Sequence, residues 1–189
     1  MTNDIDKLQS EHTDFAKLLD LLEAQIGLFH RGEQPDYNLM LYIFYDMTHY
    51  PDRFHHPKED LAFARLAERD SSTMLAVEEL ARQHRVIAKS GSRFLDNLNA
   101  ALAGAMLTRE SVEIPGLEYV MFYRSHMKME ERELFPVART LLRDDDWAQI
   151  GVAIESAEDP LFGPQVDEKR FRTIHQQIAR VAGCGCAVD

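Results

Sequence analysis

The chain is poor in cysteine, proline and glycine, and the scarcity of cysteine excludes one class of protein. Its 189 residues include 2 Cys, 7 Pro and 9 Gly. Cys184 and Cys186 are separated by one residue, so they cannot form the disulfide framework of a secreted domain. We interpret them as reduced thiols on a frayed terminus, with a redox or metal-transfer role as the alternative. So few prolines and glycines suit a helical protein with few turns.

The sequence also lacks a long apolar run and an excess of basic residues. No stretch reaches the roughly 18 apolar residues that indicate a membrane span. The polar start, residues 1–7, lacks the apolar core of a secretion signal. With 32 acidic and 21 basic residues, the net charge is -11, which argues against a nucleic-acid partner. We therefore expect one cytoplasmic domain, residues 1–189, with no membrane or nucleic-acid partner.

Helical periodicity dominates the sequence and predicts an all-α fold. Expected helices cover residues 4–29, 37–69, 72–107, 117–142, 147–156 and 167–182. We expect Asp36 to cap the second helix, Pro51 and Pro57 to kink it, and Pro115-Gly116 to break the chain before the fourth. Because short turns join the long helices, residues 4–142 predict an antiparallel four-helix up-and-down bundle. Residues 144–182 would add a helical C-terminal extension.

Histidines occupy apolar helical stripes at positions where leucine would be expected. His12 lies alone in one such stripe and His84 in another. Each is followed, after nearly the same length of chain, by a His-x-x-x-Glu pair one helical turn apart. One histidine on an apolar face is more often a hydrogen-bonded core residue, but two matching sets favour a metal. Buried glutamates need a partner, and no lysine or arginine shares their stripes. The predicted metal ligands are His12, His55, Glu59, His84, His126 and Glu130.

Four imidazoles and two carboxylates suit iron, manganese or zinc. If Glu59 and Glu130 each bridge two ions, every ion receives two histidines and two carboxylate oxygens. Four ligands satisfy a structural zinc ion. Iron prefers five or six ligands, so open positions would remain for a small molecule.

These motifs resemble the hemerythrin-like family, with its His and His-x-x-x-Glu cation-binding motif, over about residues 4–142. The matching stretches are Glu11-His12, Phe54-His55-His56-Pro57-Lys58-Glu59-Asp60, Gln83-His84-Arg85 and His126-Met127-Lys128-Met129-Glu130-Glu131. The resemblance implies two iron ions with an oxo or hydroxo bridge that bind oxygen, nitric oxide or peroxide. An iron-handling or oxidoreductase enzyme and a structural zinc bundle remain alternatives, and the C-terminal extension leaves a homodimer contact open.

The chain departs from the oxygen-carrying hemerythrins at one ligand. Those proteins have a second histidine four residues after the third-helix histidine, where this chain has Ala88. The remaining four-histidine, two-glutamate set resembles the iron-centre repair proteins of the family more closely. Candidates for the vacant ligand position are Tyr45, Tyr123, His175 and solvent.

Several acidic residues and histidines lie beside the predicted ligands. His56 and Asp60 form a pair one residue out of register, which favours a flanking role that orients a ligand. Glu131 competes with Glu130, which we prefer because its stripe continues through Leu134. A ferritin-like site is disfavoured because that family uses Glu-x-x-His, the reverse order. We assign no catalytic residue. We expect His30 and His49 to lie at the surface. We expect residues 144–146 to cap a helix.

Overall fold

The computed structural model describes residues 4–154, Asp159 and Gln176. Within these residues the chain is helical and contains no strand. Apart from Gln176, which is helical, the helix expected over residues 167–182, including His175, lies outside the described residues, as do both cysteines. In chain order the elements are α1 (Asp4–His30), α2 (Tyr37–Tyr50), the π-helix η1 (Pro51–His55), α3 (His56–Arg69), the 3-10 turn η2 (Ser71–Thr73), α4 (Met74–Leu102), α5 (Arg109–Met129), the π-helix η3 (Glu130–Leu134), α6 (Phe135–Leu141) and α7 (Asp144–Ala153).

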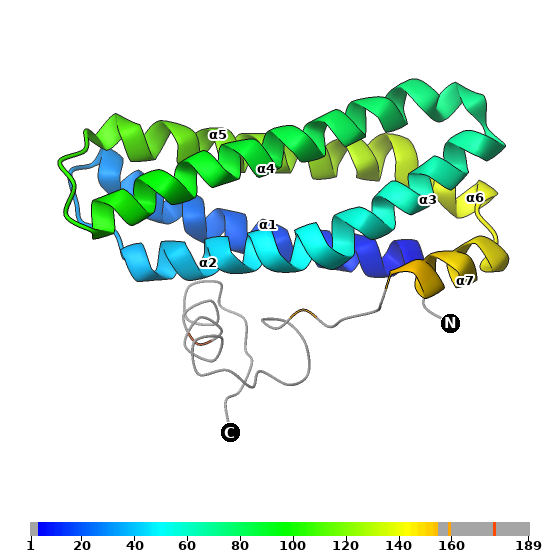
Figure 1. Cartoon of the computed structure of the whole chain (residues 1–189), viewed down its shortest axis with the longest axis horizontal. Helices are drawn as coiled ribbons and strands as arrows, with labels where there is room; N and C mark the ends of the chain where they lie inside the picture. Colours follow the sequence, from blue (N-terminus) through cyan, green and yellow to red (C-terminus); the bar gives the residue numbers. More distant parts are fainter. Residues whose placement is uncertain (1–3, 155–158, 160–175, 177–189) are drawn as a thin grey trace.

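The helices pack side by side as a bundle. α5 contacts both α1 and α4, and α2 contacts the same two helices. α2, η1 and α3 follow one another as one long helical run, as do α5, η3 and α6 (Figure 1). α7 packs on α3 near one end of the bundle. The four expected long helices therefore correspond to α1, the α2–α3 run, α4 and the α5–α6 run.

Local signals in the sequence explain where several helices begin and end. Asp36 caps α2 as expected, because its side chain accepts a hydrogen bond from the backbone N–H of Leu39 at 3.0 Å. α1 ends before Gly32 and α4 before Gly104, and both glycines have φ of +78°. This left-handed conformation suits glycine and closes the last helical turn.

Three expected boundaries were wrong. The helix expected to begin at 147 begins at Asp144, so residues 144–146 form its first turn, and Arg143 is the N-cap. The helix expected to end at 107 ends at Leu102, because Gly104 turns the chain and the apolar residues beyond it stay exposed. The helix expected to begin at 117 begins at Arg109, so Pro115 lies inside α5. Pro115 and Gly116 are both buried. The absence of a side chain at Gly116 lets α5 approach Ile26 of α1 and Phe94 of α4 closely.

Two π-helical turns interrupt the long runs, and each is closely followed by a proline. η1 ends at His55, two residues before Pro57, and η3 ends at Leu134, two residues before Pro136. A proline inside a helix lacks an N–H donor and clashes with the carbonyl four residues earlier. A π-turn inserts one extra residue, so the inward-facing positions change on either side of it. The kink expected near Pro51 and Pro57 takes this form.

The buried core consists of two apolar clusters. One is built mainly from α1, α2, α4 and α5 and includes Phe15, Phe44 and Phe94. The other is built mainly from α1, α3 and α6 and includes Phe63 and Phe135. His12 lies between them, since its ring centroid is 6.4 Å from that of Phe15 and 5.2 Å from that of Phe135. Polar side chains therefore occupy the space between the two apolar clusters.

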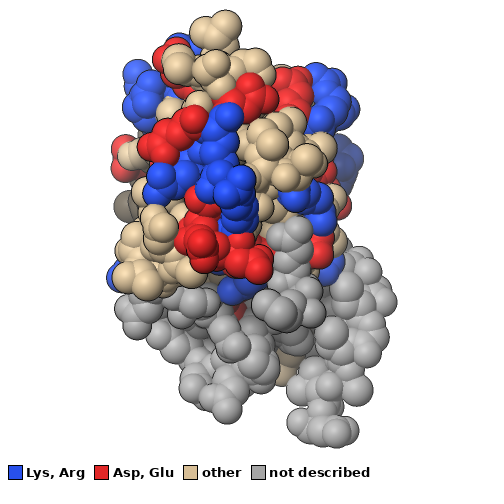
Figure 2. Space-filling model, turned by 90° about the vertical axis from the view of Figure 1, so that its right-hand side faces the viewer, with Lys and Arg blue, Asp and Glu red and all other residues tan. Residues whose placement is uncertain are grey.

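Acidic and basic side chains alternate on the end of the bundle shown in Figure 2. At this end Arg69 pairs with Asp146 at 2.8 Å, and Arg139 pairs with Asp6. Asp146 also accepts a hydrogen bond from the backbone N–H of Arg143 and so caps α7. Within the described residues, no helix combines the length and the apolar character needed to cross a bilayer.

The close packing at Gly116 predicts a loss of stability on Gly116→Ala. A Cβ atom there would lie 2.7 Å from Ile26 Cδ1 and 2.8 Å from Phe94 Cε2. Overpacking of this kind costs roughly 1–3 kcal/mol, and the better helix propensity of alanine offsets about 1 kcal/mol of it. The matched control is Gly151→Ala, where nothing lies within 4 Å. Urea denaturation should show destabilisation only for Gly116→Ala; equal stability of the two variants would contradict the packing argument.

Candidate metal centre

Five histidines and two glutamates from all four helical runs converge between the two apolar clusters. His12, His55 and Glu59 form one group whose candidate ligand atoms lie within 4.8 Å of one another. His56, Glu59, His84 and His126 form a second group by the same measure. We call these groups the two-histidine half and the three-histidine half. The structure thus brings all six predicted ligands together and adds His56; their binding to metal stays a prediction.

The two glutamates span the two halves. Glu59 Oε1 lies 3.1 Å from His55 Nε2, and Glu59 Oε2 lies 3.9 Å from His84 Nε2. Glu130 Oε2 lies 3.3 Å from both His12 Nε2 and His126 Nε2. Each carboxylate therefore faces one histidine from each half. This is the placement that a bridging ligand needs, and both side chains are 0% exposed.

When the imidazoles are neutral, the converging ring nitrogens and carboxylate oxygens all present lone pairs to one another. Neither oxygen of Glu59 or Glu130 has a hydrogen-bond partner among the described residues, and neither ring nitrogen of His126 has one. His12 Nε2 and His55 Nε2 lie 3.2 Å apart, although in neutral rings both would be acceptors. Buried polar groups left unpaired in this way are costly. The residues therefore fit a cation, which would accept these lone pairs together.

Carboxylates outside the centre set the orientation of four of the five histidines. Because an ionised carboxylate only accepts, the ring Nδ1–H must be the donor in each pair. That leaves Nε2 as the nitrogen free for a metal, an arrangement typical of metal-binding histidines. The Nδ1···O distances are 3.0 Å for His12 with Glu131, 2.7 Å for His55 with Glu11, 3.1 Å for His56 with Asp52 and 3.0 Å for His84 with Asp60.

Glu130 and Glu131, which the sequence offered as alternatives for one ligand position, have different positions in the structure. Glu130 is buried in the centre, and Glu131 stands outside it and accepts the Nδ1–H of His12. Glu59 and Asp60 divide in the same way, since Asp60 bonds His84 on the neighbouring helix. The flanking, orienting role expected of Asp60 agrees with this contact. In each pair, one residue thus lies in the centre as a candidate ligand, and its neighbour in the chain bonds a histidine on another helix.

His56 is the candidate ligand that the periodicity did not identify. It was expected to flank the site because an α-helix turns its side chain about 100° away from His55. The π-turn η1 closes with a hydrogen bond from His56 N–H to Pro51 C=O, and this wider turn directs both His55 and His56 inward. Both are buried, at 1% and 6% exposure. The sequence contained one signal of this irregular turn, because Pro57 directly follows the two adjacent histidines.

Ala88, which stands where the oxygen-carrying hemerythrins have a fifth histidine, does not lie in the metal centre. Ala88 is exposed on α4, so a side chain there would face solvent. Of the other candidates, Tyr45 stacks on exposed His49 with ring centroids 3.6 Å apart. Tyr123 lies at the edge of the centre, with its hydroxyl 3.3 Å from His56 Nε2. His56 therefore supplies a fifth imidazole from a different helix. His30 and His49 are exposed, as expected.

The pKa shifts reflect an interior with too few positive charges for its carboxylates. Burial alone would lower the pKa of His55, but Glu59 and Glu11 raise it to about 9. Burial and the nearby charge of Glu59 raise the pKa of Glu130 to about 8. Burial lowers the pKa of His126 to about 2, so this imidazole stays neutral and able to bind a metal. Without a metal, protons must therefore supply part of the missing charge.

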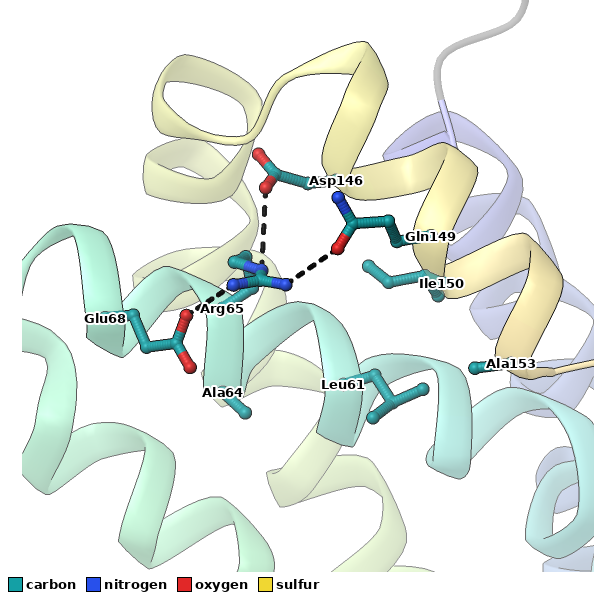
Figure 3. A pocket seen from close by; sticks show the side chains of 8 residues that line it. All are labelled: Leu61, Ala64, Arg65, Glu68, Asp146, Gln149, Ile150 and Ala153. Atoms are coloured by element: carbon teal, nitrogen blue, oxygen red, sulfur yellow. Dashed lines mark hydrogen bonds and ion pairs between the residues drawn. The ribbon is translucent and has the colours of Figure 1, made fainter.

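A surface pocket of about 290 Å³ between α3 and α7 lies apart from these ligands (Figure 3). Leu61, Ala64, Ile150 and Ala153 line it. Its arginine, Arg65, already donates hydrogen bonds to Glu68 at 2.6 Å and Gln149 at 2.9 Å. The pocket therefore offers no uncompensated charge, and no candidate metal ligand lines it.

A family model described as the hemerythrin HHE cation binding domain matches residues 3–138. The match covers well over half of the chain and includes every candidate ligand. This chain belongs to the hemerythrin HHE family. Searches of curated proteins and of solved structures gave no match. Membership of this family supports a cation as the partner of the converging lone pairs.

The charge balance of this hemerythrin centre predicts that metal binding strengthens as the pH rises. A protonated histidine must release a proton before it binds metal. The folded pKa of His55, about 9, exceeds its ordinary value of 6.5. His55 therefore stabilises the metal-free fold below pH 6.5, and this contribution is lost as the pH rises through about 9. The melting-temperature difference between metal-loaded and metal-free protein should widen from pH 6.5 to 9.

Thermal denaturation followed by circular dichroism measures this difference directly. Metal-free protein prepared with a chelator is compared with metal-loaded protein at each pH. A difference that stays constant or narrows over the same range would contradict the proposed competition between protons and metal.

Proposed function

We propose that this chain holds two iron ions, one in each half of the centre, with Glu59 and Glu130 bridging them. We propose that it binds oxygen or a related small molecule, such as nitric oxide or peroxide, at these ions. The observation that carries the proposal is the unequal division of five histidines about two buried carboxylates, each of which faces both halves. When bound, a pair of iron ions supplies changes of oxidation state and coordination positions for small ligands.

The ligand count indicates where a small molecule would bind. The three-histidine half offers three imidazoles and two bridging oxygens. The two-histidine half offers two imidazoles and two bridging oxygens, one ligand fewer. Iron prefers five or six ligands, whereas four suffice for zinc. The two-histidine half therefore has more room for an exogenous ligand, and His56 would supply the imidazole that the chain lacks at Ala88.

The chain's own residues would exclude water and orient the ligands. Phe15 packs edge-on against His55 with ring centroids 5.0 Å apart, and Phe135 stacks on His12. These rings keep the two-histidine half dry, as the low exposure of His12 (2%) and His55 (1%) indicates. A dry, apolar surround suits an uncharged diatomic ligand better than a charged one.

The proposal includes three expectations from the sequence. Residues 4–142 would form the antiparallel up-and-down bundle of four helices, the protein would reside in the cytoplasm, and a homodimer could form through the C-terminal extension. Manganese or zinc remain alternative metals for the same ligands. Iron-centre repair, iron(II) oxidation and reduction of peroxide or nitric oxide remain alternative activities of the same centre.

Metal analysis and spectroscopy of protein purified from iron-supplied cells test the proposed function. We expect stoichiometric iron and near-ultraviolet and visible absorption bands that change on exposure to oxygen. A colourless protein containing zinc and no iron would instead indicate a structural metal site. Steady turnover of peroxide or nitric oxide would favour the enzyme alternative over a binding or sensing role.

Replacement of His56 by alanine tests the fifth ligand. We expect His56→Ala to lower iron affinity at least roughly tenfold, because the three-histidine half loses an imidazole. Competition with a coloured chelator measures the affinity. His30→Ala is the matched control, since His30 is exposed and bonds Glu113 far from the centre. An affinity equal to that of the wild type would show that His56 is not a ligand, provided that the metal-free variant folds normally.

A further inference from the structure

The four carboxylates that clamp the histidines differ in their exposure to solvent. The side chains of Glu131, Asp52 and Asp60 are 39%, 40% and 55% exposed. Glu11 is 14% exposed. Its hydrogen bond with His55, at 2.7 Å, is also the shortest of the four. Because water screens exposed charges, Glu11 is the outer carboxylate whose charge acts most strongly on the centre.

Tyr50 fixes Glu11 in this position. The Tyr50 hydroxyl donates to Glu11 Oε1 at 3.0 Å, while Glu11 Oε2 accepts the Nδ1–H of His55. Tyr50 is 4% exposed, so its hydroxyl is held in the protein interior. The ammonium group of Lys7 lies 3.9 Å from Glu11 Oε1, and the Lys7 side chain is 44% exposed. Each Glu11 oxygen therefore has one buried donor, and the neighbouring cation is screened by solvent.

A carboxylate in this position acts on a metal through the histidine that it clamps. It withdraws the Nδ1 proton partly from the ring, and the ring then donates more electron density through Nε2. It also places a negative charge near the ion, and a trivalent ion gains more from that charge than a divalent one. Both effects stabilise the more oxidised ion. In the three-histidine half the corresponding carboxylates are exposed, so the effect there is smaller.

We propose that Glu11, held by Tyr50, is a positioning residue that favours the oxidised state of the ion in the two-histidine half. The two ions then have different reduction potentials, and the ion beside His12 and His55 is the harder one to reduce. This inference rests on the proposed function, because it requires iron in both halves. Glu11, which is not itself a candidate ligand, would then set the oxidation state of the ion that has fewer protein ligands.

Redox titration of the iron-loaded full-length protein tests the inference. Reduction by dithionite supplies one electron to each iron(III) to give iron(II), and the absorption bands report the midpoint potentials. Glu11→Gln keeps an acceptor for His55 but removes the charge. At the potential where the wild-type ion is half reduced, we expect this variant to hold roughly tenfold more reduced than oxidised iron. Tyr50→Phe should shift the midpoint in the same direction by less.

Two matched controls separate the effect of a buried charge from other changes. Glu131→Gln removes the exposed carboxylate that clamps His12, the other histidine of the same half, and should shift the midpoint less than Glu11→Gln. Tyr119→Phe removes another buried tyrosine hydroxyl and should leave the midpoint unchanged. Where Glu11→Gln fails to retain iron, Tyr50→Phe provides the test, since it keeps the charge of Glu11 and removes only the hydroxyl that holds the carboxylate.

The outcomes distinguish this inference from the proposed function. Iron-loaded Tyr50→Phe with a wild-type midpoint would overturn the inference and leave the function intact. Equal shifts in Glu11→Gln and Glu131→Gln would also overturn it, since burial would then have no influence. A wild-type protein that takes up no iron would overturn both.

Discussion

Two fully buried carboxylates, Glu59 and Glu130, impose the main constraint on this structure. A buried carboxylate is costly unless it is paired with a cation or hydrogen-bonded, and neither glutamate has a hydrogen-bond donor among the described residues. The surrounding imidazoles present lone pairs to the same space, so they cannot supply the missing donors in their neutral form. A cation or a set of protons is therefore required for the interior to be stable. Membership of the hemerythrin HHE family favours the cation.

The same constraint explains the irregular features of the helices. A bundle of regular α-helices would place His55 and His56 on different faces, and likewise Glu130 and Glu131. The π-turns η1 and η3 lie where these adjacent pairs must act together. They allow one residue to face the centre while its neighbour also reaches it or clamps a histidine of another helix. Pro57 and Pro136 make the regular helical alternative costly at these points.

Sequence periodicity predicted much of this arrangement, and its errors have identifiable causes. The stripe through His12 is buried as expected, and the stripe through His84 is buried from Ile87 to Leu98 with His84 itself half-buried, because regular α-helices preserve the spacing of three and four residues. The prediction gave His56 a flanking role because it assumed a regular α-helix. The π-turn η1 contains an extra residue that changes which side chains face inward, and no propensity rule predicts where a π-turn forms. The start of α5 was missed because the burial of Pro115 and Gly116 against α1 and α4 is a tertiary effect. The pairing of Glu11 with His55 joins two helices and has no periodic signal.

With iron bound, one ion would lie in each half of the centre, and His56 would bind one of them. A crystal structure of the iron-loaded protein, with anomalous diffraction measured at the iron absorption edge, would locate both ions. We expect two anomalous peaks between Glu59 and Glu130, one bound by His12 and His55 and the other by His56, His84 and His126. A single peak, or two peaks with His56 directed away from both, would contradict this expectation.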